Sequence, residues 1–182
     1  IIETERLLLR EMTDDDFQAL YKVLADSEIM QHYPDAFDEN RVRNWIERNI
    51  ERYRVFGFGL WAVCLKATGE MIGDCGLTMQ LIKGEIKPEI GYHIRADKQR
   101  KGYAKEAAIA VRDWAFNNTP FNIIYSYMKT KPEIIKSIKS LIKDGREFSS
   151  YFYKFDTKNN PKRLFYALAY TFNHFKKYRQ YK

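Results

Sequence analysis

The sequence predicts an α/β (α+β) domain, and three observations support this fold class. Segments of alternating polar and apolar residues, typical of half-buried strands, occur together with segments that have the 3.6-residue apolar repeat of helices. The chain has 182 residues, which is long enough for one substantial core. Its residues are 45% hydrophobic and 15% aromatic, a composition that argues against disorder. We therefore expect a single domain over residues 1–182, with a mostly antiparallel sheet.

The N-terminal third predicts a strand followed by two helices. Residues 6–12 predict a first strand, and residues 13–16 form a capping sequence for a helix that reaches about Ala25. A second helix is expected over residues 38–53. Between these helices, residues 30–37 are rich in aromatic side chains and predict a loop.

The middle of the chain predicts a hairpin. Residues 59–66 and 70–79 alternate as two strands around the turn signal Thr68-Gly69. Its two cysteines, Cys64 and Cys75, fall in these strands, and no Cys or His cluster accompanies them. We therefore expect buried, reduced thiols and no metal site.

A strand, a basic glycine loop and a helix follow. Residues 89–94 alternate as a strand, and residues 106–116 carry an Ala-rich helical repeat. Gly102 permits a sharp turn, and the small Ala104 leaves the first helical turn uncovered, so that successive N–H groups can point at one anion. Three cations surround this turn: Arg100, Lys101 and Lys105. The pattern indicates a pyrophosphate site, although an ordinary basic connection capped by Gly is the alternative.

The loop carries a six-residue signature, Gln99-Arg100-Lys101-Gly102-Tyr103-Ala104. This run is similar to the Q/R-x-x-G-x-G/A acetyl-CoA signature of the GNAT N-acetyltransferase superfamily. Three further segments, residues 4–10, 69–77 and 89–92, resemble the ribosomal-protein-alanine N-acetyltransferase branch. The resemblance extends from about residue 2 to residue 128.

The resemblance implies a GNAT-like mixed, mostly antiparallel twisted sheet flanked by helices. It also implies acetyl-CoA as co-substrate and direct acetyl transfer to a primary amine, either a protein N-terminus or a small amine. Backbone groups of Ile94 and Ala96 would pair with the pantetheine arm of the cofactor. The pyrophosphate would contact the loop and helix start: Arg100, Lys101, Gly102, Tyr103, Ala104 and Lys105.

Two residues on the strand before the signature are candidate catalytic bases. Glu89 matches the position where several GNAT enzymes carry a glutamate that draws a proton from the amine, although it could simply counter Lys87 at the surface. His93, four residues further on, is an alternative base, a substrate contact or a structural residue. Three other residues are expected to contact substrate: His32, Tyr33 and Tyr92.

The C-terminal portion departs from the family pattern. Residues 129–182 contain fourteen Lys or Arg and four Asp or Glu, a net charge of +10 within a chain total of +7. Residues 130–145 lack the Asn and Tyr that the family usually places in the corresponding segment and helix, so no thiolate acid is assigned. Residues 134–142 suggest a helix.

Three interpretations of this portion remain open. It is an alternative ending, with a strand at 147–155 and a helix at 163–178, or the product of a shifted reading frame in an A/T-rich gene. Less favoured is a basic, aromatic nucleic-acid surface. A catalytically weak GNAT-like domain that binds CoA or RNA is therefore the rival function.

Location and assembly are expected from composition and resemblance. No apolar run approaches the ~20 residues of a membrane span, and residues 1–10 are too charged for a secretory signal. These features predict a cytoplasmic protein without a membrane partner. GNAT proteins occur as monomers and as homodimers, and the sequence favours neither state.

Overall fold

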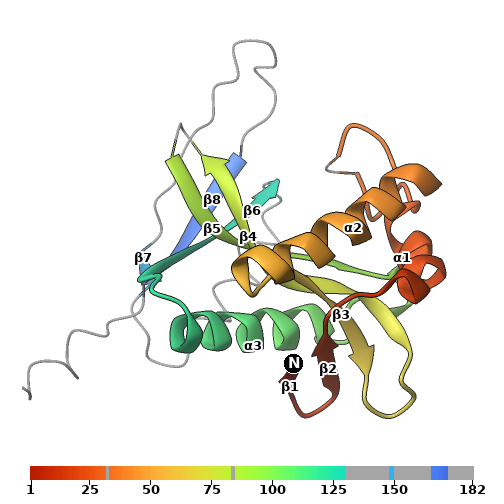
Figure 1. The fold of residues 1–182 in the computed structure, drawn as a ribbon, viewed down its shortest axis with the longest axis horizontal. Coiled ribbons are helices and arrows are strands. Elements are labelled where there is room, and N and C mark those ends of the chain that lie inside the picture. Colours follow the sequence, from red (N-terminus) through yellow and green to blue (C-terminus); the bar gives the residue numbers. More distant parts are fainter. Residues whose placement is uncertain (32, 83–84, 130–147, 150–164, 172–182) are drawn as a thin grey trace, which may run out of the picture. The chain divides into compact units, whose positions relative to one another are not determined.

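The computed structural model describes residues 1–31, 33–82, 85–129, 148–149 and 165–171 (Figure 1). The chain divides into two compact units. The first comprises Ile1–Thr78 and Ile90–Ala115, and the second comprises Met79–Glu89 and Phe116–Lys182. Two strands, β4 and β5, pass from one unit into the other. The expectation of a single domain over the whole chain stays a prediction.

Five strands contribute to the sheet of the first unit. They are β1 (Ile2–Glu3), β2 (Leu7–Arg10), β3 (Leu60–Leu65), β4 (Met71–Ile82) and β5 (Glu85–Ile94), and they lie in this order. The first three pairings are antiparallel, with Leu9 opposite Val63 and Trp61 opposite Cys75. The predicted strands are thus confirmed, whereas the two-residue β1 was not anticipated.

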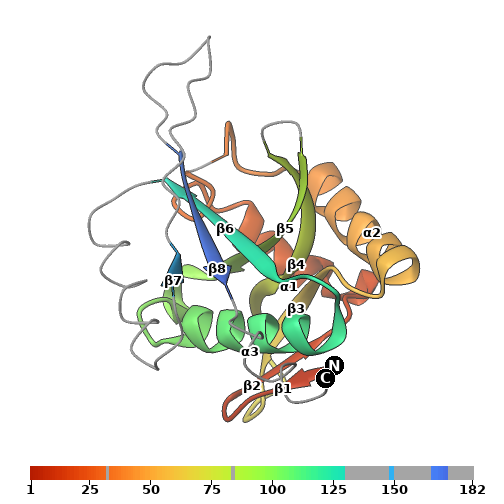
Figure 2. The same cartoon turned by 90° about the vertical axis from the view of Figure 1, so that its left-hand side faces the viewer.

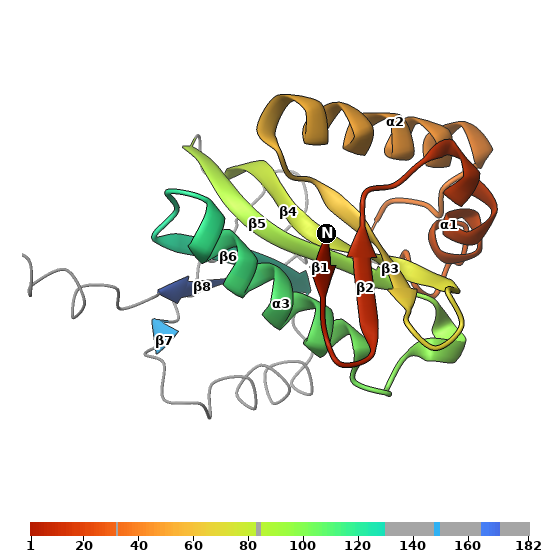
Figure 3. The ribbon, with the colours of Figure 1, turned by 60° about the horizontal axis from the view of Figure 1, so that its bottom comes forward.

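Helices cover both faces of this sheet. They are η1 (Asp14–Asp16), α1 (Phe17–Leu24), α2 (Glu39–Phe56), η2 (Ala96–Lys98) and α3 (Tyr103–Asn118). Helices α1 and α2 lie on one face and α3 on the other (Figure 3). Helix α2 begins where the Asp38 carboxylate accepts the Arg41 N–H (2.8 Å), and it ends at Gly57, whose φ is +74°. The predicted helices are confirmed, with boundaries shifted by up to three residues.

The core of the first unit follows the period of each element. Leu7 and Leu9 of β2, two residues apart, are fully buried, as are Val42 and Ile46 of α2, four residues apart. Trp61 of β3 packs edge-on against Trp114 of α3, with ring centroids 4.9 Å apart. The two thiols are free and buried, as predicted. Burial raises the pKa of the Cys75 thiol well above its ordinary value.

The second unit contains the parallel pairing. Strand β6 (Ile123–Lys129) runs parallel to β5, with Tyr125 opposite Glu89. Its other edge pairs antiparallel with β8 (Phe165–Thr171), which also pairs with β7 (Phe148–Ser149). Figure 2 shows β8 beside β6. The sheet is therefore mixed, which confirms the expected fold class.

The helix predicted over residues 163–178 is wrong where the structure describes it. Residues 165–171 form β8 instead, and seven of its residues pair in register with β6. The run Phe165-Tyr166-Ala167-Leu168-Ala169-Tyr170-Thr171 fits a two-residue period as well as a helical one, and strand pairing decides between them. Strand β7 covers part of the strand expected at 147–155. The helix suggested for residues 134–142 lies outside the described residues.

The described residues contain neither a membrane-spanning helix nor a metal-binding cluster. None of the helices in this part of the chain is sufficiently long and apolar to span a bilayer. In the same residues, no group of three or more His, Cys, Asp or Glu side chains is placed to hold a metal ion.

Candidate functional site

The loop between β5 and α3 has an unusual backbone. Arg100 has a φ of +64° and Gly102 a φ of +86°, so two residues of this short turn occupy the left-handed region. The backbone N–H of Glu106 donates to the Gly102 carbonyl (3.0 Å) and so makes a first helical hydrogen bond of α3. The N–H groups before Glu106 have no carbonyl partner within the helix. The loop therefore presents a row of donors at a positive helix end.

Arg6 holds this loop from the N-terminal segment. Its Nη1 donates to the carbonyl of Lys101 (3.0 Å), and its Nε donates to Glu106 Oε2 (2.7 Å). The guanidinium also lies over the Tyr103 ring, 4.5 Å from the centroid. Thr4 Oγ1 and the Arg6 backbone N–H donate to Glu106 Oε1 at 2.6 and 2.9 Å. We call these residues, Thr4, Arg6 and Glu106, the loop clamp.

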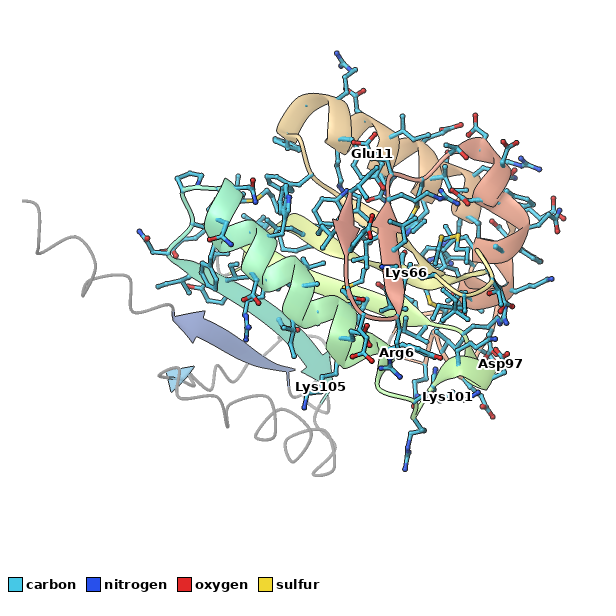
Figure 4. All side chains as sticks on the ribbon, turned by 90° about the horizontal axis from the view of Figure 1, so that it is seen from below. Arg6, Glu11, Lys66, Asp97, Lys101 and Lys105 are labelled. Carbon is cyan, nitrogen blue, oxygen red and sulfur yellow. The ribbon has the colours of Figure 1, made fainter. Side chains whose placement is uncertain are left out.

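Positive side chains surround the turn. Arg100, Lys101 and Lys105 are exposed, and Figure 4 shows Lys101 and Lys105 near Arg6 at the start of α3. The Glu106 carboxylate does not cancel this charge, since Arg6 pairs with it (2.6 Å). Burial alone would raise the pKa of Glu106, but the hydrogen bonds from Thr4 and Arg6 outweigh burial and hold the pKa below its ordinary value. The arrangement suits a polyanion.

The end of β5 is shaped by Gln99. Its side-chain amide donates to the Ile94 carbonyl (2.9 Å), and its backbone N–H donates to the Ala96 carbonyl (3.1 Å). The Arg95 N–H donates to Ile72 of β4 (2.9 Å), so strand alternation directs the Ile94 N–H to the opposite edge. For an extended ligand arm, the N–H group of Ile94 is therefore better placed than its carbonyl.

His93 lies at the centre of a polar network. Its Nδ1 is 2.7 Å from Asp74 Oδ1, and its backbone N–H donates to the same oxygen (3.1 Å). The other oxygen, Asp74 Oδ2, accepts the indole N–H of Trp45 (2.9 Å). On the far side of the ring, His93 Nε2 is 3.1 Å from the Tyr33 hydroxyl. Asp74 is fully buried, and the His93 side chain is 11% exposed.

Aromatic rings enclose this network. Tyr33 packs edge-on against Phe37 (5.5 Å between centroids), and Phe37 packs edge-on against Trp45 (5.6 Å). The Trp45 ring in turn lies edge-on to His93 (5.8 Å). Tyr33 and Phe37 of the predicted aromatic loop therefore pack against His93 of β5 and Trp45 of α2. Tyr33 and His93, which were both singled out from sequence, are in contact there.

The other candidate residues are placed differently. Glu89 belongs to the second unit, opposite Tyr125 of β6. There, the cation that Glu89 could have countered, Lys87, pairs with Glu85 (2.8 Å). Tyr92 is exposed, and strand alternation turns it away from the face that carries His93. His32 lies outside the described residues.

Comparison with known proteins assigns the family. The model of the acetyltransferase (GNAT) domain matches residues 6–141. This chain belongs to the GNAT acetyltransferase family. YnaD of Bacillus subtilis, named as an uncharacterized N-acetyltransferase, is 30% identical over 164 residues, which cover 87% of this GNAT chain and 89% of the relative.

Solved structures agree with the GNAT fold. A GNAT-family acetyltransferase from Bacillus anthracis superposes with a TM-score of 0.72 at 27% identity, covering 93% of this chain and 97% of that one. The spermidine N-acetyltransferase of Vibrio cholerae, in complex with CoA and spermine, gives a TM-score of 0.69 and covers 95% of this chain and 99% of that one. Its identity is 15%, so this second likeness shows the fold alone.

Sequence reasoning missed several residues around these GNAT elements. Asp74 and Trp45 bind His93 and one another, yet neither was singled out, and the loop clamp was quoted only in part, as resemblance. A signal for Asp74 did exist. It is a lone acid in an apolar strand, and a carboxylate that is buried needs partners.

Proposed function

We propose that this GNAT chain transfers the acetyl group of acetyl-CoA directly to a primary amine. The observation that carries the proposal is the loop before α3, where two left-handed residues and a helix N-terminus combine with exposed cations. GNAT enzymes generally use acetyl-CoA, and the family model covers this loop. No covalent enzyme intermediate is required, because the family chemistry depends on positioning and on polarisation of the thioester carbonyl.

The cofactor is assigned to two segments. In this proposal the pyrophosphate lies on the N–H groups of Arg100, Lys101, Gly102, Tyr103, Ala104 and Lys105. The pantetheine arm continues along the C-terminal end of β5, pairing with the N–H groups of Ile94 and Ala96. Exposed cations at the loop add attraction that salt screens, whereas backbone donors depend little on salt.

The acceptor amine must lose a proton before it attacks the thioester. Glu89 and His93 are both proposed bases, as the sequence suggested. A carboxylate and an imidazole can each accept this proton. Replacing Glu89 and His93 one at a time shows which of the two residues acts as the base. Glu89→Gln and His93→Gln preserve side-chain size closely enough for this comparison.

The acceptor is proposed to be a protein N-terminus or a small amine. The motifs at residues 4–10, 69–77 and 89–92 favour the first, through their resemblance to the ribosomal-protein-alanine branch. The aromatic loop at residues 30–37 is proposed to shape specificity. Of its neighbouring acids, Asp38 already caps α2, which leaves Asp35 as the candidate for attracting a cationic acceptor.

Calorimetric titration with acetyl-CoA tests the cofactor site. The test variant is Arg100→Ala combined with Gly102→Asp, which removes a cation and places a carboxylate beside the pyrophosphate. Gly69→Asp is the matched control, because Gly69 has a similar φ (+72°) and lies in a hairpin turn with nothing within 4 Å of an added Cβ. We expect the double variant to lose at least about tenfold in affinity, or 1.4 kcal/mol, and the control to bind normally.

Turnover is then measured as CoA release with polyamines, free amino acids and peptides beginning with Ala or Ser. Acetylation of any of these amines by the wild type supports the proposal. A folded wild type that fails to bind acetyl-CoA, or that binds it and acetylates none of the panel, contradicts it.

A further inference from the structure

In each hydrogen bond around His93, the donor and the acceptor can be assigned. Asp74 Oδ1 accepts the backbone N–H of His93, and it lies 2.7 Å from the ring nitrogen Nδ1. A carboxylate oxygen can only accept, so Nδ1 carries a proton. In the neutral ring Nε2 then has its lone pair exposed to the Tyr33 hydroxyl, which donates to it across 3.1 Å.

Hydrogen bonds hold both oxygens of the Asp74 carboxylate, which is the innermost group of this network. Asp74 Oδ2 accepts the Trp45 indole N–H, so the two oxygens of a fully buried group are both satisfied. Burial of a charge is costly unless it is hydrogen-bonded, and here three donors surround the carboxylate. Asp74 therefore cannot rotate without losing a partner, and it holds the imidazole in one tautomer.

The backbone enforces the same geometry. Gly73 of β4 lies so close to β5 that a Cβ at this position would overlap the His93 carbonyl oxygen. Asp74, the next residue, lies within hydrogen-bond distance of both the backbone N–H and the Nδ1 of His93. Trp45 contacts the His93 ring edge-on, and Phe37 contacts the Tyr33 ring edge-on. These contacts fix the orientation of the His93 and Tyr33 rings.

We propose that Asp74, His93 and Tyr33 form a proton relay for the acceptor amine, with Tyr33 and His93 as catalytic residues and Asp74 and Trp45 as positioning residues. The proposal rests on the acetyl-transfer function above and assigns the base among its candidates. Tyr33 is the outer member, because its hydroxyl contacts the ring nitrogen opposite the one that faces the buried carboxylate. Asp74 stabilises the imidazolium that forms when His93 accepts a proton.

The proton balance is as follows. The acceptor ammonium gives one proton to the Tyr33 oxygen while the Tyr33 hydroxyl proton moves to His93 Nε2. The free amine then attacks the thioester carbon, forming the C–N bond, and the C–S bond breaks as the tetrahedral intermediate collapses. The amide nitrogen loses its second proton to the departing sulfur, which leaves as CoA thiol. His93 returns its proton to solvent.

The first test is the tautomer of His93, read from its imidazole nitrogens by NMR of the full chain. The chain has three His residues, and His93→Gln identifies the His93 signals by their loss. In wild type we expect a protonated Nδ1 and an unprotonated Nε2 in the neutral ring. Asp74→Asn presents an amide that can donate to Nδ1, so the population should move to the Nε2–H form.

The second test is kinetic, with acetyl-CoA and an amine that wild type acetylates. Tyr33→Phe keeps the ring and removes only the hydroxyl, while Asp74→Asn keeps an acceptor for Trp45 and removes the charge. We expect each to lower kcat on the order of a hundredfold, with the KM for acetyl-CoA changed by less than about twofold. Asp16→Asn is the matched control. It alters a buried carboxylate paired with Arg10 (2.7 Å) outside the network, so it should lower stability but leave kcat and the His93 tautomer unchanged.

The outcomes separate the relay from the function on which it rests. A wild type with the Nε2–H tautomer overturns the relay. So does a wild type that acetylates an amine while Tyr33→Phe and Asp74→Asn turn over equally fast. A wild type that acetylates none of the amines overturns the proposed function itself. The expected tautomer together with the selective loss of kcat supports the relay.

Discussion

The His93 network and the loop before α3 hold their polar groups in opposite ways. At His93, a fully buried carboxylate and two aromatic donors fix a side chain from within. At the loop, the functional donors are backbone N–H groups, and the loop clamp holds them from outside through the half-exposed Arg6. The network thus orients one ring, whereas the clamp shapes a length of main chain.

This difference predicts different kinds of failure. Interactions in a buried site are strong, and a partner left unpaired there is costly, so changes near His93 should affect stability and the chemical step together. Interactions at the exposed loop are weaker and screened by salt. Changes at the clamp should therefore alter cofactor affinity and lower the free energy of unfolding by only about 1 kcal/mol.

Gly73→Ala gives the largest expected effect and tests the buried side of this comparison. The new Cβ would overlap the His93 carbonyl oxygen, so β4 and β5 must separate. We expect a loss of about 3 kcal/mol in the free energy of unfolding, measured by urea denaturation. Gly91→Ala is the control, since its Cβ would meet Leu60 at an ordinary 3.7 Å. Equal stability of the two variants would contradict the close approach.

Arg6→Ala gives the next largest effect and tests the exposed side. Loss of the guanidinium releases the Lys101 carbonyl and Glu106 together, so the loop samples more conformations. We expect about a tenfold weaker Kd for acetyl-CoA, or 1.4 kcal/mol, with kcat at saturation nearly unchanged. Arg54→Ala, which breaks an exposed pair with Glu51, is the control. A fall in kcat without a change in Kd would contradict the proposal that the clamp controls cofactor affinity while the His93 network controls the chemical step.

The clamp should also respond to acid, with a smaller effect. The pKa of Glu106 lies below its ordinary value, so its stabilising contribution is complete above that value and is lost as the pH falls through the folded-state pKa. We expect wild type to exceed Glu106→Gln in unfolding free energy by about 1 kcal/mol at pH 7. The gap should begin to narrow as the pH falls below about 4, the ordinary range of a Glu carboxyl. Denaturation at several pH values measures it, and a gap that stays constant to pH 3 would show that the charge of Glu106 is unimportant.

Local patterns predicted most of the first unit because its elements have strong periods and clear ends. The helix that begins after Asp38 was foreseen from the sequence, although it ends at Gly57 and not at the expected residue 53, and the turn at Thr68-Gly69 was foreseen too. The loop was foreseen through Gly102, but the positive φ of Arg100 was not, because a non-Gly residue gives little signal for that conformation.

Contacts between distant residues were not predicted. Asp74 and Trp45 lie 19 and 29 positions from the residues they bind in the network, and nothing in a local period connects them. The error over Phe165–Thr171 has a related cause. Its short aromatic run suits a helix or a strand, and only the partner strand β6 decides. The roles of Glu89, His93 and Tyr92 stay predictions.

The clamp also has a consequence for how the protein folds. Thr4 and Glu106 are 102 positions apart, so their contact closes most of the first unit into one loop. Closing so long a loop is entropically costly, and contacts of this separation slow folding. The N–H cradle before α3 should therefore acquire its final shape late, after the hairpin and helices between Thr4 and Glu106 have formed. Cofactor binding during refolding would then report completion of the fold, and not its early collapse.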